Sequence, residues 1–240
     1  SATMPPKMRT LAKQNLRDPF EVSIAISKPS ERVVQEAYLV RDGHKAALIH
    51  HVIKDKRDFD SIIIFSSTKK SVNDIIKGIS NKGYTVEGIS SDLEQQQREE
   101  VLNRFRAKKT RVLVATDVLS RGIDIKDISL VINYNVPGDG EDYVHRIGRT
   151  ARADAEGVAI TLVNEDEMYR LASIENLIGN EIQKLTIPVE IGESPTWNPG
   201  RPKGGFMRGS RKPEGKQGFG QKNKSGGNKK TFRPKNQDKK

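Results

Sequence analysis

The sequence predicts an α/β fold, in which a parallel β-sheet carries helices on both faces. Three observations support this prediction. Short apolar runs rich in β-branched residues recur along residues 33–191, and between them lie longer stretches in which apolar residues return at helical spacing. The strand–helix–strand unit repeats about five times, and such a repeat favours parallel strands joined by crossover helices.

Each element follows from its own segment. Strands are expected at residues 33–40 (VVQEAYLV), 61–65 (SIIIF), 85–89 (TVEGI), 111–116 (RVLVAT), 130–136 (LVINYNV) and 157–163 (GVAITLV). Helices are expected at residues 44–53 (HKAALIHHVI), 69–80 (KKSVNDIIKGIS), 94–105 (EQQQREEVLNRF), 140–149 (GEDYVHRIGR) and 167–178 (EMYRLASIENLI). Val, Ile and Leu dominate the strand segments, whereas the helical segments place apolar residues every three or four positions.

The residues before the last helix allow two interpretations. Glu165, Asp166 and Glu167 follow an apolar strand, which imitates the acids that hold magnesium in P-loop enzymes. The same acids suit the first turn of a helix, where the positive end of the helix dipole stabilises negative charge. We expect the helix start.

The positive charge is concentrated near the C-terminus. The net charge is +11, yet residues 192–240 hold 14 Lys and Arg against 3 acidic residues, while the rest of the chain holds 28 of each sign. This tail has no apolar periodicity, so we expect it to be disordered. Its cations suit a phosphate backbone, and Phe206, Phe219 and Phe232 suit stacking on unpaired bases. A purely solubilising tail is the alternative.

Composition excludes several classes of protein. The chain has no cysteine, which rules out a disulfide framework and a thiolate metal site and suits a reducing compartment. No apolar run reaches the length of a bilayer span, and no signal-peptide pattern opens the chain. We therefore expect a cytoplasmic protein without membrane contact. Because the first residue is Ser1, we expect a processed chain or part of a longer one.

The candidate site lies where the strands end, because ligands of such sheets bind beyond the carboxyl ends of the strands. Hydroxyl side chains follow the strand 61–65, and DVLSRGIDI follows the strand 111–116. The strand 130–136 leads into the helix that carries HRIGR. We expect these segments to bring hydroxyls, a glycine and guanidinium groups to one edge that binds phosphates.

Three arginines form the clearest cluster. Arg146, Arg149 and Arg152 recur at three-residue steps, so on a helix they would lie near one another on one face. Guanidinium groups bind phosphate oxygens in a bidentate way, although an ordinary basic face paired with surface acids is the alternative. The sequence contains no GxxxxGK[ST] and no strand-end acid clearly placed to hold magnesium, so the cluster lacks the loop that normally surrounds the phosphates.

Four segments resemble motifs of the DEAD-box ATP-dependent RNA helicases of superfamily 2. IIFSST, QQQR, VLVATDVLSRGIDI and YVHRIGRTARA are similar, in order and spacing, to motif IV, the QxxR element, motif V and motif VI. The opening SAT resembles motif III. The resemblance covers residues 1 to about 190, and the basic tail is similar to those of bacterial members.

The resemblance implies a RecA-like fold and four parts. Residues 1–27 would be the last helix and strand of a first RecA-like domain, 28–32 the interdomain linker, 33–191 the second RecA-like domain and 192–240 the tail. In the family the P-loop and the DEAD acids belong to the first domain. ATP and Mg²⁺ would therefore be held mainly by that domain, and this portion alone would not hydrolyse ATP.

The resemblance also assigns roles around ATP. Arg149 and Arg152 would be arginine fingers that stabilise charge developing on the γ-phosphoryl group. Asp124 would accept hydrogen bonds from the ribose, and Gly122 would allow close backbone approach. His145 would couple the domains by contacting the first domain and its SAT segment.

The SAT segment contributes Ser1 and Thr3 to this coupling. For Arg146, the first arginine of the motif, a structural ion pair is as well supported as a contact with phosphate.

For RNA, the resemblance implies contacts along the sugar–phosphate backbone, without base specificity. The matching residues are Ser67, Thr68, Gln95, Arg98, Thr116, Asp117, Arg121 and Gly122. Structural alternatives exist: Thr68 suits a helix cap, and Gln95 and Arg98 lie one helical turn apart as solvated residues often do.

The function implied is that of an ATP-dependent RNA helicase that locally unwinds RNA duplexes. Its partners would be RNA and the first RecA-like domain of the same protein. Two alternatives stay open: an RNA-binding or annealing module that acts without hydrolysis, and a superfamily 2 helicase that acts on DNA.

Overall fold

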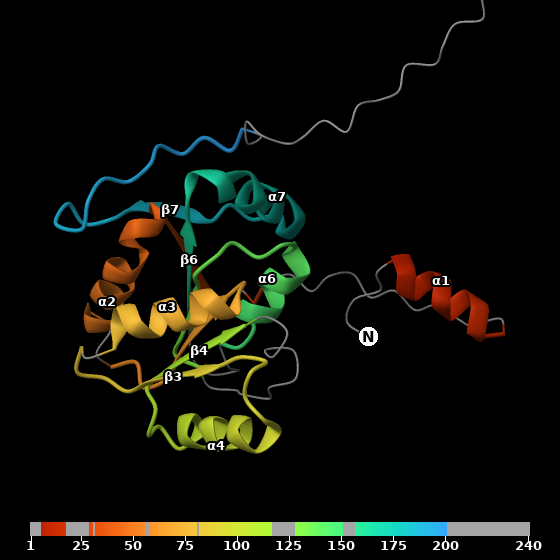
Figure 1. The fold of residues 1–240 in the computed structure, drawn as a ribbon. Helices are drawn as coiled ribbons and strands as arrows, with labels where there is room; N and C mark the ends of the chain where they lie inside the picture. The colour runs from red at the N-terminus through yellow and green to blue at the C-terminus, as the bar shows by residue number, and fades with distance from the viewer. Residues whose placement is uncertain are drawn as a thin grey trace, which may run out of the picture. The chain divides into compact units, whose positions relative to one another are not determined.

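One parallel sheet of seven strands organises the protein (Figure 1). The computed structural model describes residues 6–17, 29–30, 32–55, 58–80, 82–116, 128–150 and 157–200. The strands are β1 (Val33–Leu39), β2 (Ile62–Ser66), β3 (Val86–Ile89), β4 (Val112–Thr116), β5 (Leu130–Asn133), β6 (Gly157–Val163) and β7 (Gln183–Thr186). Their order across the sheet is β3-β4-β2-β5-β6-β1-β7, so β1 lies between β6 and β7.

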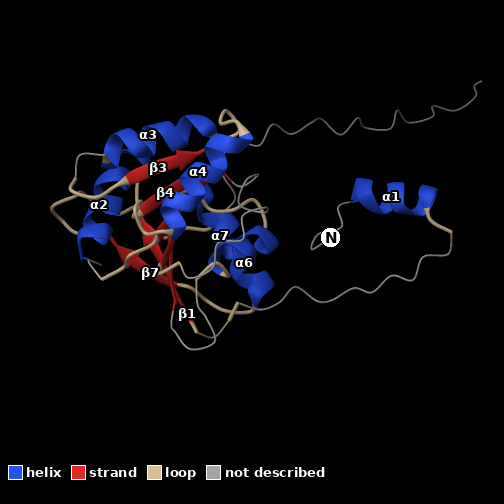
Figure 2. Cartoon of the chain, turned by 90° about the horizontal axis from the view of Figure 1, so that it is seen from below, coloured by secondary structure: helices blue, strands red, loops and turns tan. Residues whose placement is uncertain are grey.

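The helices are α1 (Pro6–Asn15), α2 (Lys45–Asp55), α3 (Lys69–Ile79), α4 (Gln95–Arg106), α6 (Gly140–Ile147) and α7 (Met168–Ile178). The helices after β1 connect successive strands, whereas α1 precedes β1. Two short 3-10 turns, η1 (Asp42–His44) and η2 (Glu165–Glu167), precede α2 and α7. Figure 2 shows α2, α3, α4, α6 and α7 around the strands.

The two faces of the sheet have separate cores. On one face Ile64 of β2 packs in a cluster with Ile49 of α2 and Ile75 of α3. On the other face the neighbouring Phe65 clusters with Phe105 of α4, while α6 and α7 cover the part of the sheet that contains β6. Alternate residues of one strand thus enter opposite cores. The predicted parallel sheet with helices on both faces is confirmed.

Every strand and helix predicted within residues 33–191 is present, with shifted ends. The predicted strand 130–136 ends at Asn133, and the predicted helix 140–149 ends at Ile147. Strand β7 was not predicted, because its sequence QKLT mixes polar and apolar residues. It is the outermost strand on one side of the sheet, and both of its end residues are exposed.

The acids before the last helix begin that helix, as predicted. Glu165–Glu167 form the 3-10 turn η2, which continues directly into α7. The side chain of Asn164 caps the turn by accepting a hydrogen bond from the Glu167 amide at 3.0 Å.

Residues 192–200, which the sequence assigned to the tail, are described and contact the domain. Trp197 packs against the α6–α7 core, and Lys184 Nζ lies 4.9 Å from the centroid of its ring. The Asn198 amide donates to Met168 Sδ at 3.2 Å. The rest of the tail, residues 201–240, lies outside the described residues, so its predicted disorder stays a prediction.

At the other end, α1 agrees with the helix expected among residues 1–27. The strand expected after it lies outside the described residues, and the assignment of this part to a first domain stays a prediction. No helix in the described part of the chain is long and apolar enough to cross a bilayer.

Candidate functional site

Three neighbouring strands, β3, β4 and β2, end side by side at one margin of the sheet. Ser66, the last residue of β2, pairs with Thr116, the last residue of β4, and the final residue of β3, Ile89, pairs with Ala115. Ser67 follows β2 directly. We call this region the β3–β4–β2 edge. It brings together Ser67, Thr68 and Thr116, as the sequence predicted.

Thr68 begins α3 at this edge. Its Oγ1 accepts a hydrogen bond from the Ser71 amide at 3.1 Å, which confirms the capping alternative and leaves its predicted contact with RNA untested. Lys69 and Lys70 follow and are exposed, and Lys69 forms an ion pair with Asp92 of the β3–α4 loop. Two lysines thus lie at the start of α3, one of them paired with a carboxylate, at a helix end where the dipole favours an anion.

Helix α4 carries Gln95 and Arg98. Gln95 Nε2 donates to Glu99 Oε1 at 3.0 Å, and Arg98 Nη2 donates to the Ser91 carbonyl at 3.4 Å. Both contacts lie on α4 and the loop that joins it to β3. Arg98 is half-buried, so its guanidinium is held against the loop before α4.

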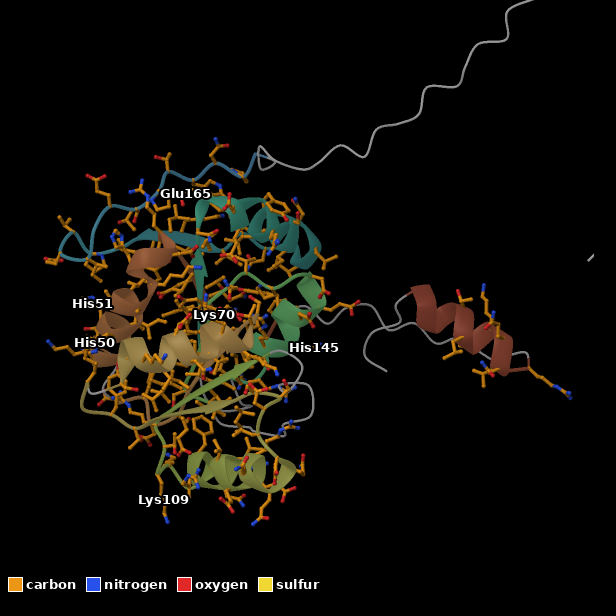
Figure 3. The ribbon with its side chains drawn as sticks, in the orientation of Figure 1. His50, His51, Lys70, Lys109, His145 and Glu165 are labelled. Carbon is orange, nitrogen blue, oxygen red and sulfur yellow. The ribbon has the colours of Figure 1, made fainter. Side chains whose placement is uncertain are left out.

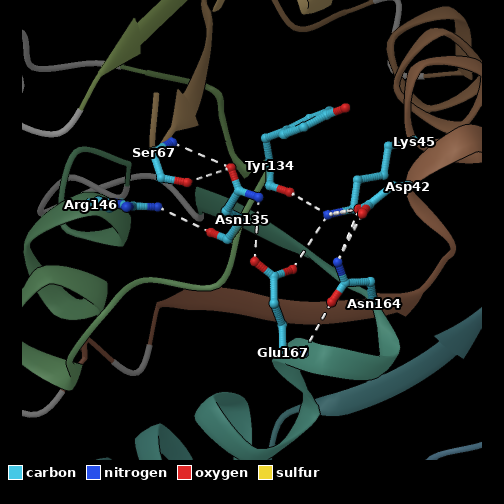
Figure 4. A network of polar contacts seen from close by, with 8 residues as sticks. All are labelled: Asp42, Lys45, Ser67, Tyr134, Asn135, Arg146, Asn164 and Glu167. Atoms are coloured by element: carbon cyan, nitrogen blue, oxygen red, sulfur yellow. Dashed lines mark hydrogen bonds and ion pairs between the residues drawn. The ribbon is translucent and has the colours of Figure 1, made fainter. Parts of the chain in front are cut away.

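A polar network continues along the same margin from β2 to β1 (Figure 4). The strands β2, β5, β6 and β1 are neighbours in this order, and the chain after each of them supplies one polar side chain to the network. Ser67 follows β2, Asn135 follows β5, Glu167 follows β6 and Lys45 follows β1. We call these four residues the Ser67–Lys45 network.

Each member of the Ser67–Lys45 network contacts the next. Ser67 Oγ and its amide donate to Asn135 Oδ1 at 2.8 and 3.3 Å. Asn135 Nδ2 donates to Glu167 Oε1 at 3.3 Å, and Glu167 Oε2 lies 3.4 Å from Lys45 Nζ. An exposed serine is thereby connected to a buried ion pair.

Lys45 is fully buried, and its ammonium group has several partners. Besides Glu167, it contacts Asp42 Oδ1 at 2.9 Å and donates to the Tyr134 carbonyl at 3.0 Å. Partial burial acts to raise the pKa of Asp42, but hydrogen bonds from Lys45 and Asn164 lower it below its usual value. A buried ammonium group is tolerated only with such compensation.

Arg146 also points into the interior. Only 3% of the residue is exposed. Its Nη1 donates to Asn133 Oδ1 at 3.0 Å and to the Asn135 carbonyl at 3.3 Å, and its guanidinium lies 5.5 Å from the centroid of the Phe65 ring. Arg146 therefore anchors the end of β5, which favours its structural interpretation.

The predicted placement of Arg149 on the same helix as Arg146 is wrong. Helix α6 ends at Ile147, and the amides of Gly148 and Arg149 bond back to Val144 and Arg146 in the closing turn. Arg149 is therefore outside the helix. Arg152 lies outside the described residues.

The prediction that Arg149 shares one edge with the hydroxyl side chains is also wrong. Thr150 Oγ1 donates to the Ile128 carbonyl at 2.6 Å, and Ile128 precedes β5. Arg149, next to Thr150, thus lies near the amino end of β5, opposite the β3–β4–β2 edge. The reason is that α6 is a crossover helix, which must return the chain to the amino end of the sheet before β6 can begin.

His145 projects from the last turn of α6 and is half-buried (Figure 3). The other candidate residues lie outside the described ones, and their roles stay predictions. They are Ser1, Thr3, Asp117, Arg121, Gly122, Asp124 and Arg152.

The described residues fit ATP and Mg²⁺ differently. A guanidinium group binds phosphate oxygens in a bidentate way, so the residue type at Arg149 suits the phosphates of ATP. No three His, Cys, Asp or Glu side chains converge within the described ranges.

Sequence reasoning missed most of the Ser67–Lys45 network. Lys45, Asn135 and Glu167 were not recognised as partners of Ser67, because they come from three different strand ends. The signal was available only in part. Glu167 comes shortly after the predicted strand 157–163, so the rule that directed attention to Ser67 applies to it, whereas Asn135 lies inside the predicted strand 130–136.

Comparisons with known proteins agree with this geometry. The family model "Helicase conserved C-terminal domain" matches residues 43–154. The ATP-dependent RNA helicase DbpA of Bacillus subtilis is 41% identical over 189 residues, 78% of this chain and 39% of the relative. The ATP-dependent RNA helicase CshA of Limosilactobacillus reuteri is 40% identical over 178 residues, 74% of this chain and 36% of the relative. The chain thus spans less than two fifths of the length of these relatives.

Solved structures give the same result. The E. coli DEAD-box protein SrmB, solved bound to regulator of ribonuclease activity A, has a TM-score of 0.63 and 32% identity, and the match covers 68% of this chain and 98% of that one. The C-terminal domain of the DEAD-box protein Dbp5 has a TM-score of 0.61 and 31% identity, with 65% and 91% coverage.

The fold, the matched residues and these structures define a RecA-like helicase C-terminal domain. The structures that this chain covers almost completely are those of DEAD-box proteins. The chain belongs to the DEAD-box family, as the motif resemblance predicted.

Proposed function

We propose that this chain is the second RecA-like domain of an ATP-dependent RNA helicase that locally unwinds or remodels RNA duplexes. The observation that carries the proposal is the separation of two groups of candidate residues on one sheet. Ser67, Thr68 and Thr116 lie at the β3–β4–β2 edge, while Arg149 lies near the amino end of β5. One domain can then contact RNA and a nucleotide at the same time.

RNA would bind at the β3–β4–β2 edge through its backbone. Lys69 and Lys70 and the start of α3 offer positive charge to a phosphate. Arg98 on α4 and the undescribed residues Asp117, Arg121 and Gly122 would extend the contact surface. Because these groups address phosphates and sugars, binding would be indifferent to base sequence.

ATP would be held mainly by another domain, because the sequence contains no GxxxxGK[ST]. Bound ATP would supply the γ-phosphoryl group whose transfer to water drives the cycle. Arg149 and Arg152 would stabilise the charge on that group, and Asp124 and Gly122 would lie near the ribose. His145 would contact the other domain together with Ser1 and Thr3.

Closure of the two domains on RNA would bend the strand and melt a few base pairs, and reopening would release it. Chemistry at the amino end of β5 and RNA contact at the opposite margin would be coupled through the rigid sheet between them. The relatives' names support this activity, since both curated relatives are ATP-dependent RNA helicases.

The first test is ATP hydrolysis by the full-length protein, measured without nucleic acid, with single-stranded RNA and with DNA of the same sequence. We expect stimulation by RNA only, and no hydrolysis by the 240-residue chain alone. Equal stimulation by DNA would instead indicate a superfamily 2 DNA helicase. RNA binding without any hydrolysis by the full-length protein would indicate an RNA-binding or annealing module.

The basic tail is expected to add affinity without specificity. Residues 201–240 contain all 14 Lys and Arg of the predicted tail. Deleting them should weaken RNA binding by the 240-residue chain and flatten its dependence on salt, because fewer counterions are released. Anisotropy titrations with a labelled oligonucleotide at several salt concentrations measure both quantities. An unchanged salt slope would show that the tail does not contact RNA.

A further inference from the structure

We propose that Ser67 faces bound RNA as a hydrogen-bond acceptor for a ribose 2′-hydroxyl, and that Asn135, Glu167 and Lys45 are positioning residues that fix this role. The inference rests on the proposed binding of RNA at the β3–β4–β2 edge. It assigns to one side chain the distinction between RNA and DNA. It follows from the direction of the hydrogen bonds in the Ser67–Lys45 network, that is, from which group donates and which accepts.

The direction of these hydrogen bonds is set first by Lys45, which lies in the interior. Its ammonium group is fully buried and contacts Glu167 Oε2 at 3.4 Å. The Glu167 side chain is itself only 8% exposed. An ionised carboxylate beside this cation has no proton to donate, so Glu167 can only accept hydrogen bonds.

Glu167 in turn decides the orientation of Asn135. Only the Nδ2 group of an amide can donate to a carboxylate, and Asn135 Nδ2 lies 3.3 Å from Glu167 Oε1. The backbone of Asn135 is held as well, because Arg146 Nη1 donates to its carbonyl at 3.3 Å. The oxygen Oδ1 of Asn135 must therefore face Ser67.

This orientation uses both protons of Ser67. Its Oγ–H donates to Asn135 Oδ1 at 2.8 Å, and its amide donates to the same oxygen at 3.3 Å. The exposed Oγ keeps only lone pairs for a ligand. A phosphate oxygen, which also only accepts, gains nothing from Ser67, whereas a 2′-hydroxyl can donate to it. DNA lacks that group.

The test compares oligonucleotides of one sequence made as RNA, as DNA and as 2′-O-methyl RNA. Their affinities for the 240-residue chain are measured by anisotropy, at a salt concentration that suppresses non-specific contacts of residues 201–240. We expect Ser67→Ala to weaken RNA binding about three- to tenfold and to leave the other two affinities unchanged. Ser173→Ala, at an exposed serine of α7, is the matched control and should change none of them.

The positioning role has its own readout. Glu167→Gln should lower the ratio of RNA to DNA affinity, and combining it with Ser67→Ala should lower the ratio no further, because both changes remove the same contact. Independent, purely structural effects would instead add. Circular dichroism checks the fold, and Asn135→Ala, which frees the Ser67 hydroxyl, provides the same test if Glu167→Gln does not fold.

The outcomes separate this inference from the proposed function. If Ser67→Ala weakens RNA and DNA binding equally, Ser67 contacts the shared backbone and the inference is wrong, although RNA binding stands. If Glu167→Gln and Asn135→Ala leave the affinity ratio unchanged, their positioning role is wrong. A wild-type chain that binds no RNA would contradict the proposed function itself.

Discussion

Arg149→Ala is expected to lower RNA-stimulated ATP hydrolysis by the full-length protein about a thousandfold or more, the effect typical of an arginine finger. Arg149 follows the end of α6, and its neighbour Thr150 bonds to the Ile128 carbonyl, so the backbone there is anchored independently of the arginine side chain. Steady-state kcat with saturating RNA and ATP measures the loss. RNA affinity, measured separately, should stay close to that of the wild type.

The matched control is Arg170→Ala, which removes an exposed arginine of α7. It should leave hydrolysis unchanged. If Arg149→Ala also keeps the wild-type rate, the finger assignment is wrong. Arg146→Ala is not a suitable control, since Arg146 is buried and anchors the end of β5.

Lys45→Met is expected to lower the free energy of unfolding by about 3–5 kcal/mol. The substitution keeps the length of the side chain but leaves Glu167 buried without its cation, and it removes the donor to the Tyr134 carbonyl. Urea denaturation of the 240-residue chain, followed by circular dichroism, measures the change. The cost comes from the uncompensated carboxylate rather than from lost packing.

A double substitution distinguishes these two causes. Lys45→Met with Glu167→Gln leaves no unpaired charge, so it should recover a large part of the lost stability. Lys54→Met, at an exposed lysine near the end of the same helix, should cost less than about 0.5 kcal/mol. A Lys45→Met chain as stable as the wild type would show that the ion pair does not contribute to folding.

The fold was predictable because strands that are buried on both faces of the sheet have a sequence pattern that can be recognised locally. Strands such as Ile62–Ser66 are buried at every position, so their sequences are continuous apolar runs that differ clearly from the helices between them. Strand β7 lacks this pattern, since it pairs only with β1 and its ends are exposed. Strand β7 therefore forms by pairing with β1 once the rest of the sheet is in place.

The candidate site was predictable only in part. Residue types after a strand predicted that Ser67 and Thr68 would lie at the β3–β4–β2 edge, because parallel strands end at the same margin. The same rule misplaced Arg149, since it follows a helix that carries the chain back across the sheet. Lys45 and Glu167 are 122 positions apart, and no local pattern indicates that two such residues will meet in the interior.

The position of β1 between β6 and β7 has a consequence for synthesis of the chain on the ribosome. Val33 pairs with Gly157, and Glu36 pairs with Gln183, so β1 has no partner when it is made. At about 5–20 residues per second, β6 follows roughly 6–25 s later. During that time the apolar side chains of β1 lack their core and are accessible to chaperones or to other nascent chains. The strand of the sheet that is synthesised first is therefore among the last to be incorporated.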